Sequence, residues 1–308
     1  DISEIENITV LKDAAAAIYG SRASQGAILV KTRRGEAGKP KISYSGKFAF
    51  NDAVSHSKTM NAYEYGLFAN SFLRGLGVSR ADYLFSDEEL EQMKSLDYNW
   101  LEEGWKPAHN YQHSLNISGG TEKVSYFTGG SYTTQTANMG EDNYTRWNFR
   151  SGIDAVVASG LKLGVTLAAH KSNRIKPYTK TISRLNDDSY GEAGQGIPDY
   201  AYMLHTPKYI PWSWEYEDGE EYYVSPALGP AQNSSTADVL RQIPSWNYFA
   251  MIDGGSLSES ESGSYDANFS LQYDIPFIKG LKIKGTYATT FHSSMDEQIQ
   301  TPYTLLRA

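Results

Sequence analysis

The sequence contains no cysteine, which excludes disulfide bonds, cysteine-ligated zinc or iron–sulfur sites and thiol nucleophiles. It also contains no apolar run near the roughly 18 residues that a helix needs to cross a bilayer. Its mean hydropathy of −0.50 agrees with that observation. We therefore do not expect a helical membrane protein.

Positive charge is scarce as well. The 308 residues include 28 Lys and Arg against 36 Asp and Glu, so the formal net charge is −8. Nucleic-acid backbones bind through a surplus of basic side chains, and this chain has neither that surplus nor a long basic block. We expect no nucleic-acid partner.

Aromatic residues and glycine are abundant, with 23 Tyr and 27 Gly. Many of them occur in segments where apolar and polar residues alternate, as in a β-strand whose two faces meet different surroundings. In one segment Trp147 and Phe149 share a face, while Arg146 and Arg150 share the other. Seven such strands are predicted, at residues 41–50, 109–118, 124–135, 144–157, 161–170, 265–274 and 281–291.

These segments are longer than the roughly five or six residues of a soluble strand, and they match a tilted strand that crosses a membrane. Their connections alternate between short turns, as at 158–160, and two long loops at 51–108 and 174–262. Outer-membrane β-barrels have short turns on one side and long loops on the other. A soluble β-sandwich with one face in water shows the same alternation, so both folds stay open on pattern alone.

The first 40 residues do not alternate in this way. Residues 5–11 favour a short strand or the start of a helix, and residues 14–19 favour a helix that ends at Gly20. Residues 27–30 form a continuous apolar run, which predicts a strand.

The same region carries a specific resemblance. Its run IENITVLKDAAAAIYGSRASQGAILVKTRRG, residues 5–35, resembles the end of the plug domain of SusC/RagA-type TonB-dependent transporters nearly position by position. Thr9 stands where the family has Glu, and Lys31 interrupts a pair of Thr. The runs LNISGGT at 115–121 and TPKYIP at 206–211 extend the resemblance along the chain.

The resemblance implies a fold and a division of the chain. The implied fold is all-β, a transmembrane antiparallel β-barrel with about seven of an expected roughly 22 strands, together with the C-terminal end of an α+β plug domain. Residues 1–38 would end the plug, and residues 39–308 would form the N-terminal part of the barrel with its long external loops. We therefore expect the chain to be an internal fragment, whose two open sheet edges would make it unstable alone.

The resemblance also implies a function in the bacterial outer membrane. A multi-pass barrel of this family would import oligosaccharides or peptides together with a SusD-like surface lipoprotein. The TonB–ExbB–ExbD complex would drive import through the missing N-terminal part. No enzymatic activity, cofactor or metal is expected. The alternatives are a soluble carbohydrate-binding β-sandwich module and a structural outer-membrane barrel without energised transport.

Two sets of candidate site residues follow. The first lies on the polar face of one predicted hairpin and would contact either the plug or a passing solute: Arg146, Arg150, Asp154 and Lys162. The second lies around a predicted type I′ turn at Asp218–Gly219, which would place Trp214 opposite Tyr223 and Tyr216 opposite Glu221.

In that second set one face of the hairpin would carry the aromatic residues Trp212, Trp214, Tyr216 and Tyr223. Aromatic faces stack on the apolar faces of sugar rings or side chains, so a substrate-binding role is one hypothesis. An aromatic cluster that stabilises the loop, or a surface covered by the partner lipoprotein, is the alternative. The nearby acidic residues lack the spacing of a calcium loop.

Histidines and helices complete the predictions. His109 and His113 have a metal-like spacing, but on a strand we expect them to lie among the aromatic residues at a membrane interface. The other histidines have no catalytic neighbours in sequence. Helices are predicted at 62–76 and 87–96, and Ser86 followed by Glu89 is a capping box for the second helix.

Overall fold

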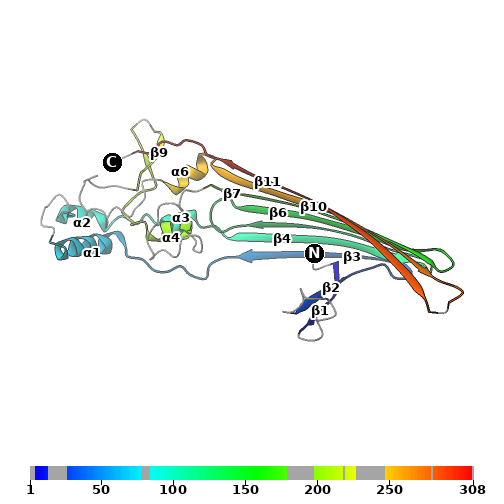
Figure 1. Ribbon diagram of the computed structural model, residues 1–308. Coiled ribbons are helices and arrows are strands. Elements are labelled where there is room, and N and C mark those ends of the chain that lie inside the picture. Colours follow the sequence, from blue (N-terminus) through cyan, green and yellow to red (C-terminus); the bar gives the residue numbers. More distant parts are fainter. Residues whose placement is uncertain are drawn as a thin grey trace.

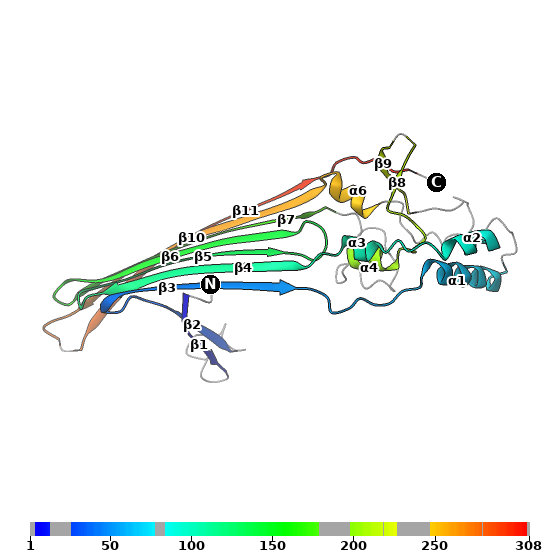
Figure 2. The same ribbon diagram turned by 180° about the vertical axis from the view of Figure 1, so that it is seen from behind.

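The computed structural model describes residues 4–12, 26–77, 84–178, 198–217, 219–226, 247–278 and 280–306. It shows a long, twisted sheet with a helical region at one end and a small separate hairpin beside it (Figures 1 and 2).

Seven antiparallel strands of the described residues form the large sheet, in the spatial order β11-β10-β7-β6-β5-β4-β3. This confirms the seven strands predicted from alternation. Within this sheet each strand pairs with the next strand along the chain. The one exception is that β7 pairs with β10, because the short β8 and β9 between them form a separate sheet. The strands are β3 (Gly38–Asn51), β4 (Ala108–Gly120), β5 (Val124–Thr136), β6 (Asn143–Ala158), β7 (Leu161–Pro177), β10 (Leu257–Asp274) and β11 (Lys282–Ile299).

The pairing register separates polar from apolar side chains across the whole sheet, because directly opposed residues point to the same face. One row reads Tyr44, Leu115, Gly130, Phe149, Ala169, Tyr265 and Phe291. The adjacent row on the other face reads Ser45, Ser114, Ser131, Asn148, His170, Ser264 and His292.

The apolar face is the exposed one, which is the reverse of a water-soluble sheet. Phe149 is 51% exposed and Phe291 is 64% exposed, whereas Ser131 and Ser264 on the polar face are 4% and 6% exposed. No second sheet of the described residues packs on the apolar face, so the sandwich alternative is not what the chain forms.

Three strands extend well past the predicted ends towards the helical region, since β7 continues to Pro177, β10 begins at Leu257 and β11 continues to Ile299. The outward face of β10 is apolar from Tyr265 to Tyr273 but carries Glu259 and Glu261 before that. The hydropathy alternation therefore stops there, while the backbone ladder continues. Pattern alone located the apolar part of each strand and not its hydrogen-bonded end.

The apolar stretch has the length of a membrane crossing. On β10 it runs from Tyr265 to Tyr273 and on β11 from Ile283 to Phe291. A tilted transmembrane strand needs about 9–11 residues to cross the hydrocarbon core. The polar ends of these strands then extend beyond that core on the side of the long loops.

The small hairpin consists of β1 (Ile5–Leu11) and β2 (Ala27–Thr32), which pair antiparallel. The first was predicted as either a strand or a helix start, and the structure shows the strand. The predicted helix at 14–19 lies outside the described residues.

The helical region contains α1 (Ala62–Gly75), α2 (Asp87–Met93), α3 (Trp100–Gly104), α4 (Pro198–His205) and α6 (Tyr248–Asp253). The predicted capping box is present at the start of α2, where the Glu89 amide donates to Ser86 Oγ at 3.2 Å and the Ser86 amide donates to Glu89 Oε2 at 2.7 Å. None of the described helices is long and apolar enough to cross a membrane.

A compact aromatic core joins the two long loops. Its buried members are Trp100, Leu101, Tyr202, Met203, Ile210, Tyr248 and Met251. Trp100 is completely buried, and its indole Nε1–H donates to the Ile210 carbonyl oxygen at 2.8 Å. One loop thus supplies the indole ring and the other supplies the carbonyl oxygen that it binds, so the two loops form one folded unit at the end of the sheet.

Replacement of Trp100 tests this unit. We expect Trp100→Ala to destabilise the loop region by about 3–5 kcal/mol, because the change leaves a large cavity and an unpaired carbonyl oxygen. Amide hydrogen exchange of α3 and α4 in the full-length protein measures the effect. Trp214→Ala is the matched control, since Trp214 is 55% exposed. Equal exchange in both variants would show that Trp100 does not hold the loops together.

Candidate functional site

The strongest candidate site is the junction between the small hairpin and the polar face of the sheet. Arg34 follows β2 directly, and its Nη1 atom is 3.8 Å from Asp154 Oδ2 on β6. A Cβ atom built on Gly35 would stand 2.3 Å from the Tyr126 backbone nitrogen of β5. Only glycine permits this close approach, so the chain after β2 touches the wall backbone directly.

The other end of the hairpin reaches the same wall. Glu4, immediately before β1, is 8% exposed and interacts electrostatically with Arg150 of β6, as does Arg34. Among the described residues, Glu4 Oε1 and Arg150 Nη1 are buried without a hydrogen-bond partner. A buried charge is costly unless it is paired, so these opposite charges stabilise each other across the junction through the field between them.

One apolar residue on the polar face lies beside Arg150. Phe127 of β5 is 3% exposed, and the Arg150 guanidinium lies 5.9 Å from its ring centre. Sequence analysis did not single out Phe127. The signal was present, since Phe127 is a large apolar residue at a polar position of the alternation.

The four predicted polar-face residues divide into two pairs. Arg150 and Asp154 face the hairpin. Arg146 instead donates from Nε to Asn148 Oδ1 at 2.9 Å, and Lys162 lies 3.8 Å from Asp274 near the short turns. The latter pair therefore contacts the wall itself in this structure.

A second polar network lies on β7, β10 and β11. Ser264 Oγ lies 2.8 Å from His170 Nδ1 and 3.3 Å from Asp266 Oδ2, and Thr290 donates to Asp266 Oδ1 at 2.7 Å. Cross-strand pairing brings Ser264 to His170 and Asp266 to Ser264, contacts that the spacing of these residues in the sequence does not show. The set is not a catalytic triad, since Asp266 contacts the serine oxygen instead of orienting the imidazole.

The aromatic hairpin has a different register from the predicted one. In β8 (Ser213–Glu215) and β9 (Glu221–Tyr223), Trp214 pairs with Tyr222 and Ser213 pairs with Tyr223. The loop therefore has three residues, 217–219, and Gly219 has a φ of 80°. A three-residue hairpin loop with a glycine in the left-handed conformation is a common type. The shift of one residue in the pairing moves the β9 side chains to the opposite face of the hairpin. Asp218 lies outside the described residues.

The exposed aromatic face consequently holds Trp214, Tyr216 and Tyr222. They are 55%, 57% and 37% exposed, and the two tyrosine rings are 6.4 Å apart. Trp212 and Tyr223, which were predicted to share that face, turn to the helical region.

These two residues have partners in the helical region. Trp212 packs on Tyr98 and Phe249, while the Tyr223 hydroxyl donates to the Asp253 carboxylate. Burial and the Asp253 contact raise the pKa of Tyr223.

No group of three His, Cys, Asp or Glu side chains that could hold a metal occurs in the described residues. His113 lies 2.7 Å from the Tyr44 hydroxyl through Nδ1, and the His109 ring lies 5.1 Å from that of Tyr111. Four residues along a strand span about 13 Å, which is too far for two ligands of one ion.

The structure defines a class of protein. An antiparallel wall with an apolar exterior, a polar interior and a docked hairpin is the wall of a plugged transmembrane β-barrel. The chain matches no protein-family model. It is 30% identical over 147 residues to the TonB-dependent receptor SusC of Bacteroides thetaiotaomicron, which covers 47% of this chain and 14% of that protein.

Similarity extends over nearly the whole chain in other relatives. The TonB-dependent receptor P3 of Formosa agariphila is 24% identical over 285 residues, or 92% of this chain and 24% of that protein. The structure of the RagAB peptide importer in its closed-closed state matches 98% of this chain with a TM-score of 0.67 and 21% identity. The open-open state matches with a TM-score of 0.65. The resemblance to SusC/RagA-type transporters and the predicted fold class are confirmed.

The chain is shorter than all of these relatives, since it spans 33% of the RagAB chain and less than a quarter of the curated receptors named above. The names of these relatives are those of receptors and importers and not of enzymes.

Loss of the buried charge at the junction tests the docking of the hairpin. We expect Arg150→Met to lower the free energy of local opening of β1 and β2 by about 1–3 kcal/mol, because buried Glu4 would then have no positive charge of β6 near it. Amide exchange of both strands in the full-length protein should become about ten- to a hundredfold faster. Arg146→Met, on the same strand and face, should leave that exchange unchanged. Equal effects of the two changes would refute the assignment.

Proposed function

We propose that this chain is part of an outer-membrane importer that depends on TonB and takes up oligosaccharides or peptides. The observation that carries the proposal is the docking of the β1–β2 hairpin on the polar face through Arg34, Asp154 and Arg150, opposite the apolar exterior. A polar lumen closed by a removable element is a gate. No covalent chemistry is needed, because binding and displacement of the hairpin suffice for passage.

The docking contacts suit a plug that must move. Arg34 and Asp154 are 68% and 46% exposed at a distance of 3.8 Å, so water screens this pair and it stabilises the junction only weakly. Glu4 is only 8% exposed, so water screens its electrostatic interaction with Arg150 less. A pull transmitted from TonB through the region that precedes the hairpin would separate few strong contacts.

The exposed face of the β8–β9 hairpin supports substrate capture. Trp214, Tyr216 and Tyr222 stand on the loop side of the wall and present rings that could stack on sugar rings or apolar side chains. Trp212 and Tyr223 would support this face from the helical region without touching substrate. Of the two substrate classes, peptide is the one that the name of a structural neighbour prints, and the aromatic face accepts either.

A surface of α1 supports a partner on the outer side. Leu67, Phe68, Phe72 and Leu76 are 38–52% exposed along one helix, and the two phenylalanine rings lie 6.0 Å apart. An apolar helix face of this kind is typical of an interface. We assign it to a SusD-like surface lipoprotein that closes over the loops. The TonB–ExbB–ExbD complex is the expected partner on the opposite side.

Deletion of the full gene tests the proposal. Growth on a panel of defined oligosaccharides and peptides should fail for one substrate class and recover on complementation. Dissipation of the proton gradient should abolish uptake of the same substrate into cells with the gene. Uptake that persists without the gradient would favour the structural barrel without energised transport, and unchanged growth on every substrate would refute import.

Substitution of Trp214 tests capture. We expect Trp214→Ala to weaken uptake at low substrate concentration by about fivefold or more, because stacking of one aromatic ring contributes about 0.5–1.5 kcal/mol beyond its buried area. Trp214→Phe should retain most uptake, since it keeps a ring. Concentration-dependent uptake by whole cells is the measurement. Uptake by Trp214→Ala that equals the wild type at every concentration would remove Trp214 from the site.

A further inference from the structure

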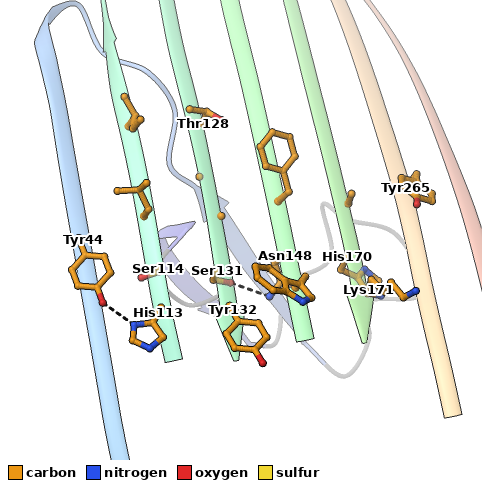
Figure 3. Close-up of a pocket in the computed structure, with 17 residues that line it drawn as sticks. Tyr44, His113, Ser114, Thr128, Ser131, Tyr132, Asn148, His170, Lys171 and Tyr265 are labelled. Carbon is orange, nitrogen blue, oxygen red and sulfur yellow. Dashed lines mark hydrogen bonds between the residues drawn. The ribbon is translucent and has the colours of Figure 1, made fainter. Parts of the chain in front are cut away.

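The aromatic rings of the β8–β9 hairpin stand on an open surface. The groove of about 570 Å³ in Figure 3 lies elsewhere, on the large sheet, and its lining includes Leu115 and Phe149 but no residue of β8 or β9. Trp214, Tyr216 and Tyr222 are exposed. Their orientation towards a substrate therefore depends on the short hairpin that carries them.

The hairpin is too small to fix that orientation by itself. β8 and β9 have three residues each, and they form a sheet of two strands. An isolated two-stranded hairpin is marginally stable in water. Leu306 supports one side of it, since Leu306 exchanges backbone hydrogen bonds of 2.8 Å with Tyr223 and Ser225. This contact is made to the β9 side of the hairpin, so the orientation of β8 needs a second support.

Asn247 joins both strands at the base of the hairpin. It is completely buried, and its Nδ2 donates to the Trp212 carbonyl oxygen at 2.7 Å and to the Val224 carbonyl oxygen at 2.9 Å. Trp212 directly precedes β8, and Val224 directly follows β9. The Trp212 carbonyl oxygen also accepts the Val224 amide at 3.0 Å. One side-chain amide group thus closes the hairpin at the point where its two strands meet the rest of the chain.

The oxygen of the same side chain begins a helix. Asn247 Oδ1 accepts the backbone amides of Phe249 at 2.9 Å and Ala250 at 3.1 Å, so Asn247 is the N-cap of α6. A side-chain amide has two N–H donors and an oxygen that accepts two hydrogen bonds. All four are used here, which explains why a polar side chain can be completely buried at this position.

The helix α6 contacts the hairpin at two further places. The Phe249 ring lies 6.0 Å from the Trp212 ring, and Asp253, the last residue of α6, accepts a hydrogen bond from the Tyr223 hydroxyl. The N-cap, the first turn and the last residue of one short helix therefore all hold the hairpin. Figures 1 and 2 show α6 beside the hairpin at the loop-side end of the sheet.

The helix α6 is in turn attached to the wall. Gly254, Gly255 and Ser256 are the residues between α6 and β10. Thr301, which follows closely after β11, donates from Oγ1 to the Gly254 carbonyl oxygen and from its amide to Ser256 Oγ at 3.1 Å. The connection from β10 and β11 to the exposed rings thus runs through α6 and then through Asn247.

We propose that Asn247 is a positioning residue for substrate capture, because it holds the base of the β8–β9 hairpin on α6 and so keeps Trp214, Tyr216 and Tyr222 in one orientation. The inference rests on the proposed capture role of these three rings. Asn247 itself is buried and acts through them. A hairpin that is ordered before binding spares the free-energy cost of ordering it, so Asn247 affects the affinity of capture and not the passage through the lumen.

Asn247→Asp and Asn247→Ser test the attachment. Asp and Ser are both good N-caps, so each keeps the start of α6, and neither supplies the two N–H donors that bind the carbonyl oxygens of Trp212 and Val224. Asp keeps the shape of the side chain, and Ser adds no buried charge, so one variant remains informative if the other fails to fold. In the full-length protein we expect amide exchange of β8 and β9 to become about tenfold faster or more. Exchange of α6 should change much less.

Uptake by whole cells tests the positioning role. The probes are labelled maltohexaose and a labelled tryptic digest of casein, one for each substrate class. We expect both Asn247 variants to raise the half-saturating concentration about fivefold and to retain the maximal uptake per receptor at the cell surface. A general folding defect would lower the maximal uptake instead. Combined with Trp214→Ala, the loss should be smaller than the product of the two separate losses, because Asn247 acts through the rings that it positions.

Asn61→Asp and Asn61→Ser are the matched controls. Asn61 is the N-cap of α1, where its Oδ1 accepts the Glu64 amide at 2.8 Å, so the same changes at a cap of another helix should alter neither readout. Exchange of β8 and β9 that stays at the wild-type rate in both Asn247 variants would overturn the attachment. Faster exchange with an unchanged half-saturating concentration would overturn the positioning role.

Failure of the proposed function gives a different result. Trp214→Ala with unchanged uptake, or wild-type cells that import neither probe, would remove the capture role that Asn247 serves. Amide exchange needs no substrate, so it decides in either case whether Asn247 holds the hairpin.

Discussion

Continuous in-register pairing of seven antiparallel strands is the constraint on which the other features of this protein depend. Because opposed residues share a face, one register places most polar side chains on the lumen face and the large apolar ones of the membrane band on the exterior. A shift of one residue in a single strand would place Arg150 in the hydrocarbon and Phe149 in the lumen. The docked hairpin and the lumen network both presuppose this arrangement.

The two faces of the wall achieve stability in different ways. The polar face buries its small side chains in hydrogen-bonded rows, as between Asn148 and Ser131 at 3.0 Å, and it buries Phe127 beside Arg150. The apolar face leaves large side chains such as Phe149 exposed, so its stability comes from the surrounding lipid. The loop region is the part that resembles a soluble protein, with Trp100 in a closed core.

Much of this was predictable from sequence because strand alternation is local. The seven strands, the capping box at Ser86 and Glu89, and the polar face with Arg150 and Asp154 follow from residue spacing. Hairpin register was not predictable, because Asp218–Gly219 suits either a two-residue or a three-residue loop. Strand ends were also missed where the exterior of β10 is acidic, since hydrogen bonding continues there without a hydropathy signal.

The sequence by itself determined the class of the molecule, because alternation over long segments and the plug-like run at 5–35 are properties of neighbouring residues. Tertiary structure alone decided which polar residues meet. Arg34 and Asp154 are far apart in the chain and lie 3.8 Å from each other only in the folded protein, as His170 and Ser264 meet when β7 pairs with β10. Such contacts depend on register and docking, which are set by the sum of many pairings and not by any local pattern.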